Sequence, residues 1–294
     1  MLISEEEVEN ELLQLAEYLP TPSISKINGI VVVDESKNES GSFKCRSALS
    51  VLHRFRNKDI VTASTGNFGK SLKILSTLFN VRVIVIVPES TSIDNLKYLR
   101  ELPGEVIVKG NDLNDSILEA SNFGHRNHAI FVNTVSESCI LGVSTLFLQL
   151  KRLGLLEKKR KMVLPIGQGT LAAAATFLKD VELIGVVPAE SSAFADSFIE
   201  GTPIFSPIKD SELYSYKVSR PNAKIFDVIR KNYKDIKSIH SRELTNNEFF
   251  SGENYDLDNL VSLNYCLKHE PNAITVVSGG KFNRSVVKVI KETA

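Results

Sequence analysis

Short apolar runs rich in β-branched residues alternate along the chain with longer segments of helical periodicity. Most of these runs are almost continuously apolar, which is typical of strands that helices cover on both faces. The alternation is typical of βαβ winding and predicts an α/β fold with mostly parallel sheets. Seven runs are predicted as strands: Gly29 to Val33, Asp59 to Thr62, Arg82 to Val87, Glu105 to Lys109, Lys161 to Ile166, Leu183 to Val187 and Ala273 to Val277.

The predicted strands fall into two main groups, which suggests two domains. One group lies between about Asp59 and Lys109 and the other between Lys161 and Val277, and the helical stretch Val135 to Leu155 separates them. Each group could form a sheet of its own. The segment Pro203 to Asn222 has no clear period and contains several helix breakers, so we predict an irregular surface segment or a lid there.

Composition and charge exclude several classes of protein. The chain has 294 residues, of which 43% are hydrophobic, and this is enough for one large core or two moderate ones. Lys plus Arg and Asp plus Glu both number 35, so no charge excess favours a nucleic-acid partner. No apolar run reaches membrane-spanning length, and the acidic N-terminus is unlike a signal peptide. We therefore expect a cytoplasmic protein without a membrane partner.

Cysteine and histidine spacing argues against a metal centre. Cys45, Cys139 and Cys266 show no C-x-x-C spacing, which argues against a disulfide framework and a structural zinc site. His125 and His128 could share a helix face, but no carboxylate or cysteine stands at ligand spacing from them. We expect no bound metal.

The first stretch that suggests chemistry runs from Glu39 to Ala48. Lys44 follows a Ser-Gly-Ser-Phe turn at the start of a predicted helix. A helix N-terminus disfavours a cation and lowers the pKa of an ammonium group placed there. A nucleophilic or Schiff-base lysine needs such a lowered pKa. The alternative is an ordinary solvated lysine in the first turn of a helix.

A second stretch, Thr62 to Lys70, lies between a predicted strand and a helix and reads Thr-Ala-Ser-Thr-Gly-Asn-Phe-Gly-Lys. Small residues at such a turn leave backbone N–H groups and hydroxyls free to hold an anion such as a carboxylate. The alternative is an ordinary strand-to-helix turn with a capping hydroxyl.

The third stretch, Met162 to Ala172, contains Gly167 and Gly169 at another strand-to-helix turn. Glycines let the backbone approach a phosphate, and the helix start supplies N–H donors. The stretch also fits G-x-G-x-x-A, and Glu190 follows the next strand, which is the dinucleotide-binding fingerprint in outline. Phosphate and dinucleotide binding both stay open on this pattern.

The fourth stretch, Val276 to Lys281, contains Ser278-Gly279-Gly280 where the last predicted strand ends, and a final helix is predicted from about Asn283. Open α/β sheets bind their ligands at the carboxyl ends of their strands. A simple tight turn is the alternative.

Taken in this order, the four stretches resemble the fold type II enzymes that depend on pyridoxal phosphate (PLP). This is the tryptophan synthase β-subunit family, which includes threonine synthase, threonine/serine dehydratase and cysteine synthase. The resemblance implies two α/β domains, each a mostly parallel sheet flanked by helices, with PLP in the cleft between them. It implies a larger cofactor-binding domain of residues 1–44 and 146–294, a smaller domain of residues 45–145, and a homodimer.

The resemblance also assigns roles in binding the cofactor. In the family a Ser-Phe-Lys-x-Arg stretch, matched here by Ser42 to Arg46, carries the Schiff-base lysine, so Lys44 is the expected catalytic residue. Asn67 is expected to contact the 3-hydroxyl of the cofactor, and Ser278 is expected to face its pyridine nitrogen. The phosphate is expected to lie against Gly167, Gln168, Gly169 and Thr170. Many members have four glycines in the phosphate loop, so we expect the side chains of Gln168 and Thr170 to turn outward.

For the substrate, the resemblance implies a small hydroxy-amino acid or its activated (phospho) ester, deprotonated at its α-carbon by Lys44 and then subject to elimination or replacement. The loop expected to hold its carboxylate contains Ser64, Thr65, Gly66 and Phe68. A phosphorylated substrate would need further cations, for which Lys70 and Arg220, and also Arg46, are candidates.

The residues leave the exact reaction open. Asp34 to Asn38 and Ala63 to Asn67 look most like threonine synthase, whereas Ser278-Gly-Gly looks more like the dehydratases and cysteine synthase. We favour a threonine synthase-like enzyme, with threonine/serine dehydratase or an O-acetylserine or O-phosphoserine sulfhydrylase as alternatives. Two hypotheses of another class remain: a nicotinamide-dependent dehydrogenase that uses Gly167, Gly169 and Glu190, and a non-catalytic homologue that only binds a ligand.

Overall fold

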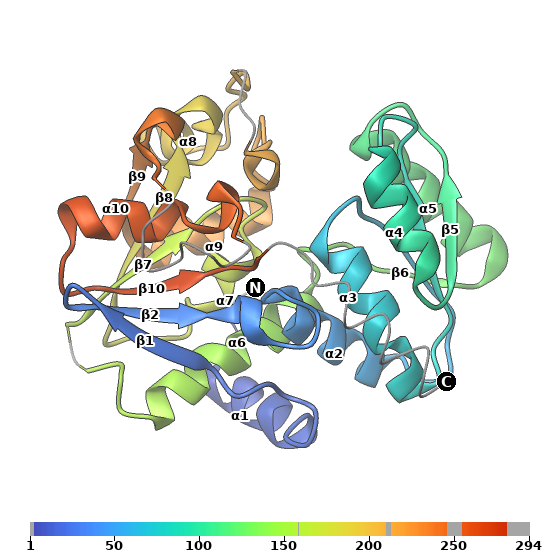
Figure 1. Cartoon of the computed structure of the whole chain (residues 1–294), viewed down its shortest axis with the longest axis horizontal. Helices are drawn as coiled ribbons and strands as arrows, with labels where there is room; N and C mark the ends of the chain where they lie inside the picture. Colours follow the sequence, from blue (N-terminus) through green and yellow to red (C-terminus); the bar gives the residue numbers. More distant parts are fainter. Residues whose placement is uncertain (1–2, 158, 210–212, 246–254, 281–294) are drawn as a thin grey trace.

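Two lobes, each built on one sheet, make up the chain (Figure 1). The computed structural model describes residues 3–157, 159–209, 213–245 and 255–280. One sheet has six strands and the other has four. The two groups of strands predicted from the sequence thus lie in two different sheets.

The larger sheet has the strand order β1-β2-β10-β7-β8-β9. β1 pairs antiparallel with β2, and all the other neighbours are parallel. The strands are β1 (Ser23–Ile27), β2 (Ile30–Asp34), β7 (Lys161–Pro165), β8 (Glu182–Pro188), β9 (Tyr233–Ile239) and β10 (Ile274–Val277).

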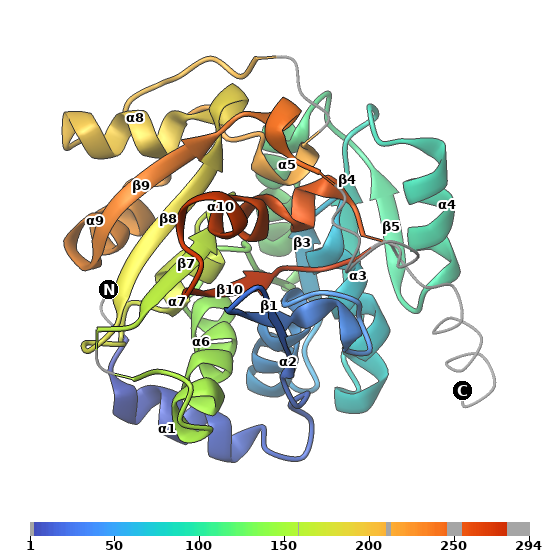
Figure 2. The same ribbon diagram turned by 60° about the vertical axis from the view of Figure 1, so that its left-hand side comes forward.

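Helices cover both faces of this sheet (Figure 2). Side chains alternate between the two faces of a strand, so Val31 and Val33 of β2 join one core while Ile30 and Val32 join the other. The first core holds residues of α1 (Glu5–Gln14), α6 (Glu137–Arg152), α7 (Thr170–Ala174), α8 (Ala193–Glu200) and α9 (Ala223–Asn232), and the second holds residues of α10 (Val261–His269).

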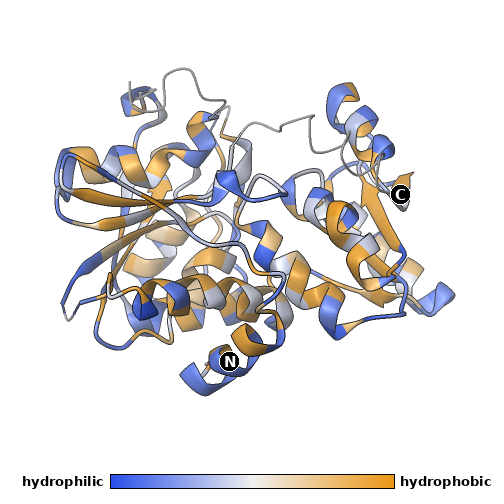
Figure 3. Cartoon of the chain, turned by 60° about the horizontal axis from the view of Figure 1, so that its bottom comes forward, coloured by the Kyte–Doolittle hydropathy of each residue, from blue (hydrophilic) through white to orange (hydrophobic). Residues whose placement is uncertain are grey.

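The smaller sheet has the strand order β5-β4-β3-β6, and all its strands are parallel. Its strands are β3 (Ile60–Ala63), β4 (Val83–Val87), β5 (Glu105–Val108) and β6 (Ile130–Phe131). α2 (Lys44–Arg54), α3 (Asn67–Leu75) and α4 (Ile93–Glu101) pack on one face, and α5 (Leu113–Asn127) packs on the other. Burial on both faces explains the continuously apolar runs, which Figure 3 shows as orange strands inside each lobe.

All seven predicted strands are present, to within one or two residues at their ends. Three further strands, β1, β6 and β9, were not predicted. β1 and β9 lie at the edges of the larger sheet and carry exposed polar side chains, and β6 has only two residues. The other regular elements of the described residues are short 3-10 helices: Glu35–Lys37, Ser76–Phe79, Ala189–Ser191, Tyr214–Tyr216, Ser241–Glu243 and Leu257–Asn259.

Within the described part of residues 203–222, the only regular element is the 3-10 helix Tyr214–Tyr216, in line with the predicted irregular segment. The helix predicted from about Asn283 lies outside the described residues. The proposed domain boundary at 44/45 falls at the first residue of α2, and the one at 145/146 falls inside α6.

The described residues offer no group of three or more His, Cys, Asp or Glu side chains that could hold a metal ion. Cys45, Cys139 and Cys266 are buried and form no disulfide. No helix within the described ranges has both the length and the apolar character needed to cross a membrane.

Candidate active site

A cavity of about 230 Å³ opens where the carboxyl ends of strands from both sheets meet. The segments that follow β3 and β6 form its wall on the side of the smaller sheet, and those that follow β7 and β10 form it on the side of the larger sheet. The four stretches selected from the sequence therefore line one cavity. Ligands of open α/β sheets bind at this kind of position.

Lys44 is the first residue of α2 and lies in the wall of this cavity. Its position depends on contacts between the first and fourth stretches: Phe43 N donates to Ser278 O over 3.0 Å, and Ser42 bridges Gly279. The Lys44 Nζ atom lies 3.3 Å from Thr170 Oγ1 and 4.6 Å from the centroid of the Phe43 ring.

Burial lowers the pKa of Lys44 from its ordinary value near 10.5 to about 8. The sequence predicted a lowered pKa but attributed it to the helix start, whereas loss of hydration is the main cause. The nearby thiol of Cys139 acts in the opposite direction on this pKa. An amine with a pKa of about 8 is partly unprotonated near neutral pH, as a nucleophile or general base requires.

The loop from Ser64 to Phe68 lies across the cavity at the start of α3. Ser64 Oγ accepts hydrogen bonds from Gly69 N at 3.1 Å and from Gly66 N at 3.4 Å, so it supports the loop itself. Within the described ranges, the backbone N–H groups of Thr65, Asn67 and Phe68 have no hydrogen-bond acceptor. Free amides at a helix start suit a small anion such as a carboxylate.

The loop from Gly167 to Thr170 brings bare backbone to the cavity. Gly169 has a φ of +93°, and a Cβ atom there would come within 2.6 Å of Ile225 Cγ2. A Cβ atom on Gly167 would come within 2.4 Å of Ser215 O. Both positions therefore require glycine, for backbone conformation or for close packing.

Gln168 is exposed, as expected for an outward-facing side chain. For Thr170 the expectation is wrong, because this residue is only 2% exposed. The Thr170 hydroxyl donates to Thr134 O over 2.9 Å and accepts from Lys44 Nζ. The carbonyl that orients Thr170 belongs to a segment far away in the sequence.

Ser278 lies in the cavity wall, and its hydroxyl donates to Asn259 Oδ1 over 3.1 Å. Asn259 was not predicted, and no local pattern distinguishes it. Asn133 and Thr134 also line the cavity and were missed because they follow the two-residue strand β6. The irregular segment supplies Tyr214 to Tyr216 to the cavity wall.

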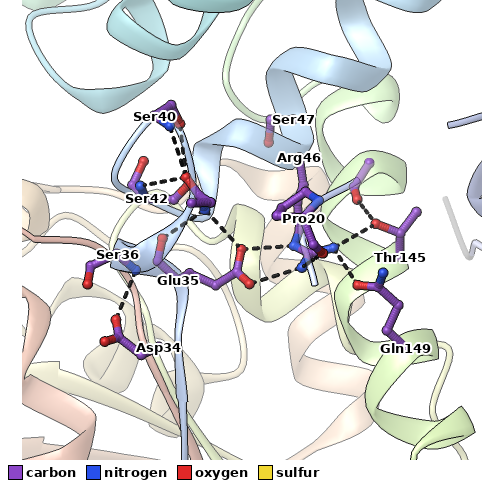
Figure 4. Close-up of polar contacts among 12 residues, drawn as sticks. Pro20, Asp34, Glu35, Ser36, Ser40, Ser42, Arg46, Ser47, Thr145 and Gln149 are labelled. Atoms are coloured by element: carbon purple, nitrogen blue, oxygen red, sulfur yellow. Dashed lines mark hydrogen bonds and ion pairs between the residues drawn. The ribbon is translucent and has the colours of Figure 1, made fainter. Parts of the chain in front are cut away.

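Three cations proposed for a substrate phosphate lie outside the cavity wall. Lys70 Nζ donates to Asn95 Oδ1 over 3.4 Å, and Arg220 Nη2 donates to Pro203 O over 3.2 Å. Arg46 is fully buried and bonds Glu35, as Figure 4 shows. Its place there excludes the suggested role of Arg46 as a phosphate donor.

The arrangement fits PLP. A glycine loop with open backbone suits a phosphate, and a lysine with a lowered pKa suits an aldehyde. The dinucleotide reading fits less well, because Glu190 lies outside the cavity wall and accepts hydrogen bonds from Ser241 N and Ser241 Oγ. In a dinucleotide site that carboxylate would bond a ribose.

The family model described as "Pyridoxal-phosphate dependent enzyme" matches residues 13–246. The chain is 25% identical over 220 residues to the L-threonine ammonia-lyase of Geobacter sulfurreducens, which covers 71% of this chain and 54% of that protein. The chain thus spans about half the length of this curated relative.

Solved structures show the same fold. Maize serine racemase superposes with a TM-score of 0.86 at 14% identity and covers 100% of this chain and 99% of its own. Threonine deaminase isoform 2 from Solanum lycopersicum gives 0.82 at 18% identity, with 100% and 95% covered. Together with the family match, this likeness confirms the fold expected from the resemblance: the chain belongs to the pyridoxal-phosphate dependent enzyme family, whose cofactor is PLP.

Proposed function

We propose that the protein is a PLP-dependent ammonia-lyase that converts a small, uncharged hydroxy-amino acid, such as threonine or serine, into a keto acid and ammonia. The observation that carries this proposal is the charge of the cavity. Lys44 is the one charged side chain among the described residues that line it. A substrate with a charged side chain would be buried there without a partner, which is costly.

The chain's own residues divide the work of binding. The backbone of the Gly167 to Thr170 loop would hold the cofactor phosphate, and the free amides of Thr65, Asn67 and Phe68 would hold the substrate carboxylate. Asn67 and Ser278 would bond the ring of the cofactor. When bound, PLP supplies an electron sink for the negative charge that develops at the substrate α-carbon.

The Lys44 amine is the proposed base. It takes the α-proton of the substrate, and the electron pair of that C–H bond allows the bond from the β-carbon to the hydroxyl group to break. The protonated amine then returns its proton to the departing hydroxyl, which leaves as water. Addition of water to the remaining unsaturated amino acid then releases ammonia and a keto acid. The lowered pKa of Lys44 makes its unprotonated form accessible at neutral pH.

The comparisons favour the dehydratase alternative over the threonine synthase-like reaction that we favoured from the sequence. The cavity supports the same choice, because Lys70, Arg220 and Arg46 do not line it. A phosphorylated substrate would bring a second dianion into the site, where the described lining residues offer no arginine and no lysine besides Lys44 to pair it. A homodimer and a cytoplasmic location remain predictions.

The test is a substrate panel on the purified protein with PLP. It measures keto acid from L-threonine and L-serine, D-serine from L-serine, phosphate from O-phosphohomoserine and O-phosphoserine, and sulfide-dependent cysteine from O-acetylserine. We expect keto acid and ammonia in equal amounts from threonine or serine. Phosphate or cysteine as the main product would refute the proposal.

Two lysine variants serve as a matched pair in the same assay. Lys44→Ala should abolish keto acid formation, whereas Lys70→Ala, which lies outside the cavity wall, should keep it within about threefold of the unsubstituted protein. Borohydride reduction and peptide mapping should place the cofactor adduct on Lys44. An adduct on another lysine would overturn the assignment.

A further inference from the structure

A buried hydroxyl lies beside the amine of Lys44. It belongs to Thr170, the first residue of α7, which follows Gly169 in its left-handed conformation. Thr170 is 2% exposed yet lines the cavity. Its contacts join three segments: the start of α2 through Lys44, the glycine loop, and the segment after β6 through Thr134.

The direction of the hydrogen bonds follows from proton counting. A threonine hydroxyl has one proton and two lone pairs. Thr170 Oγ1 donates its proton to the carbonyl oxygen of Thr134, which has no proton to give, over 2.9 Å. A lone pair of Thr170 therefore faces Lys44 Nζ at 3.3 Å, and the lysine is the donor.

Few other groups compete for the lysine amine. Thr170 Oγ1 is its one hydrogen-bond acceptor in the described parts of the chain. The Lys44 amine lies over the face of the Phe43 ring, 4.6 Å from the ring centroid, and this ring has no oxygen or nitrogen to accept a hydrogen bond. Cys139 is the neighbouring titratable group, and burial raises the pKa of its thiol to about 11, so this thiol is neutral near pH 7.

We propose that Thr170 is the positioning residue for Lys44: oriented by the Thr134 carbonyl, its hydroxyl accepts a hydrogen bond from the lysine amine and keeps that amine directed into the cavity. This inference rests on the proposed role of Lys44 as the base. The competing role for the same hydroxyl is a direct contact with the cofactor phosphate. The two roles predict different effects when the hydroxyl is removed.

The first measurement uses the cofactor-free protein and needs no activity. Lys44 is labelled with acetic anhydride over a range of pH, and its modification is followed by peptide mass mapping in Thr170→Val, Thr170→Ser and the unsubstituted protein. An acceptor stabilises the charged amine, so its loss in Thr170→Val should lower the pKa of Lys44 by about one. Thr170→Ser keeps a hydroxyl and should restore the original curve.

Thr176→Val is the matched control. Thr176 is also 2% exposed, and its hydroxyl also donates to a backbone carbonyl, Ala173 O, over 2.7 Å, but it does not line the cavity. This variant should leave the labelling curve of Lys44 unchanged. If Thr170→Val does not fold, Thr170→Ala removes the same hydroxyl without adding an apolar branch.

The second measurement separates the lysine from the phosphate. Pyridoxine 5′-phosphate carries the ring and phosphate of the cofactor but has no aldehyde to react with Lys44. Its affinity should be unchanged in Thr170→Val, while kcat with PLP and the preferred substrate should fall about tenfold at little change in KM.

A weaker affinity for pyridoxine 5′-phosphate, together with an unchanged labelling curve for Lys44, would overturn the inference and assign Thr170 to the phosphate. If the unsubstituted protein lacks ammonia-lyase activity but Thr170→Val still shifts the labelling curve, the positioning of Lys44 stands and the proposed reaction falls. The two failures are therefore distinguishable.

Discussion

Replacing Glu35 by glutamine should destabilise the fold by about 3–5 kcal/mol, because it leaves a buried arginine without its counter-charge. The side chain of Arg46 is 0% exposed and that of Glu35 is 2% exposed. The Arg46 guanidinium donates to both Glu35 carboxylate oxygens, at 2.8 and 3.0 Å. Pro20 O, Thr145 Oγ1 and Gln149 Oε1 accept its other hydrogen bonds (Figure 4).

The size of the effect follows from the solvation of the two charges. In Glu35→Gln the guanidinium keeps its neutral acceptors, but it loses the carboxylate, and the new amide group presents N–H donors to it. Breaking a buried pair in this way typically costs about 3–5 kcal/mol, whereas an exposed pair is worth about 0–1 kcal/mol. Asp59→Asn is the matched control, because the Arg82–Asp59 pair is 58% and 43% exposed.

The assay is urea-induced unfolding of the cofactor-free protein, followed by far-ultraviolet circular dichroism. Glu35→Gln should lower the free energy of unfolding by several kcal/mol, and Asp59→Asn should change it by less than about 1 kcal/mol. Replacing the whole pair, in a Glu35→Leu, Arg46→Met double variant, should recover much of the loss. A Glu35→Gln variant as stable as Asp59→Asn would refute the reasoning that the charges are desolvated.

Three further predictions concern the cofactor site. Gly169→Asp should reduce PLP retention at least about tenfold, since its side chain would meet Ile225 and set a carboxylate against a phosphate; a folded variant with full PLP content would contradict this. In the cofactor-free protein, Lys44 modification should rise with pH and level off above about pH 8–9, as its amine loses its proton, whereas exposed lysines should keep gaining reactivity; parallel curves would contradict its lowered pKa. Ser278→Asp should shift the products from elimination toward transamination, because a carboxylate favours a protonated ring nitrogen; an unchanged product ratio would count against the placement of Ser278.

The sequence predicted the buried strands well but missed β1 and β9 at the two edges of the larger sheet, for one physical reason. A parallel strand covered on both faces is almost wholly apolar, and this distinguishes Val83–Val87 or Ile274–Val277 from any loop. An edge strand keeps polar, exposed residues, as in Ser23–Ile27 and Tyr233–Ile239. Such runs do not differ in composition from surface loops.

Site residues could be predicted where they depend on a local sequence pattern, and not where they depend on contacts between distant segments. The loops after β3, β7 and β10 could be selected because strand-to-helix turns with small residues are local patterns. The direction of the Thr170 side chain could not, because it depends on Thr134, which is 36 residues away in the chain. Arg46 stands two residues after Lys44 in α2, and residues at this spacing do not share a helix face, which explains why Arg46 lies away from the cavity.

In the proposed reaction, the two sheets would contribute different parts of the cavity wall. The larger sheet supplies the glycine loop and Ser278, which are proposed to hold the cofactor. The smaller sheet supplies the loop after β3 and an apolar surface made of Leu113, Ile117 and Phe131. A substrate held by its carboxylate on the smaller sheet would present its side chain near that surface, where a methyl group is accommodated and a charge is not. Lys44 lies at the start of α2, outside both the glycine loop and the loop after β3. Its hydrogen bond to Thr170 places its amine beside the glycine loop, which is proposed to hold the cofactor phosphate.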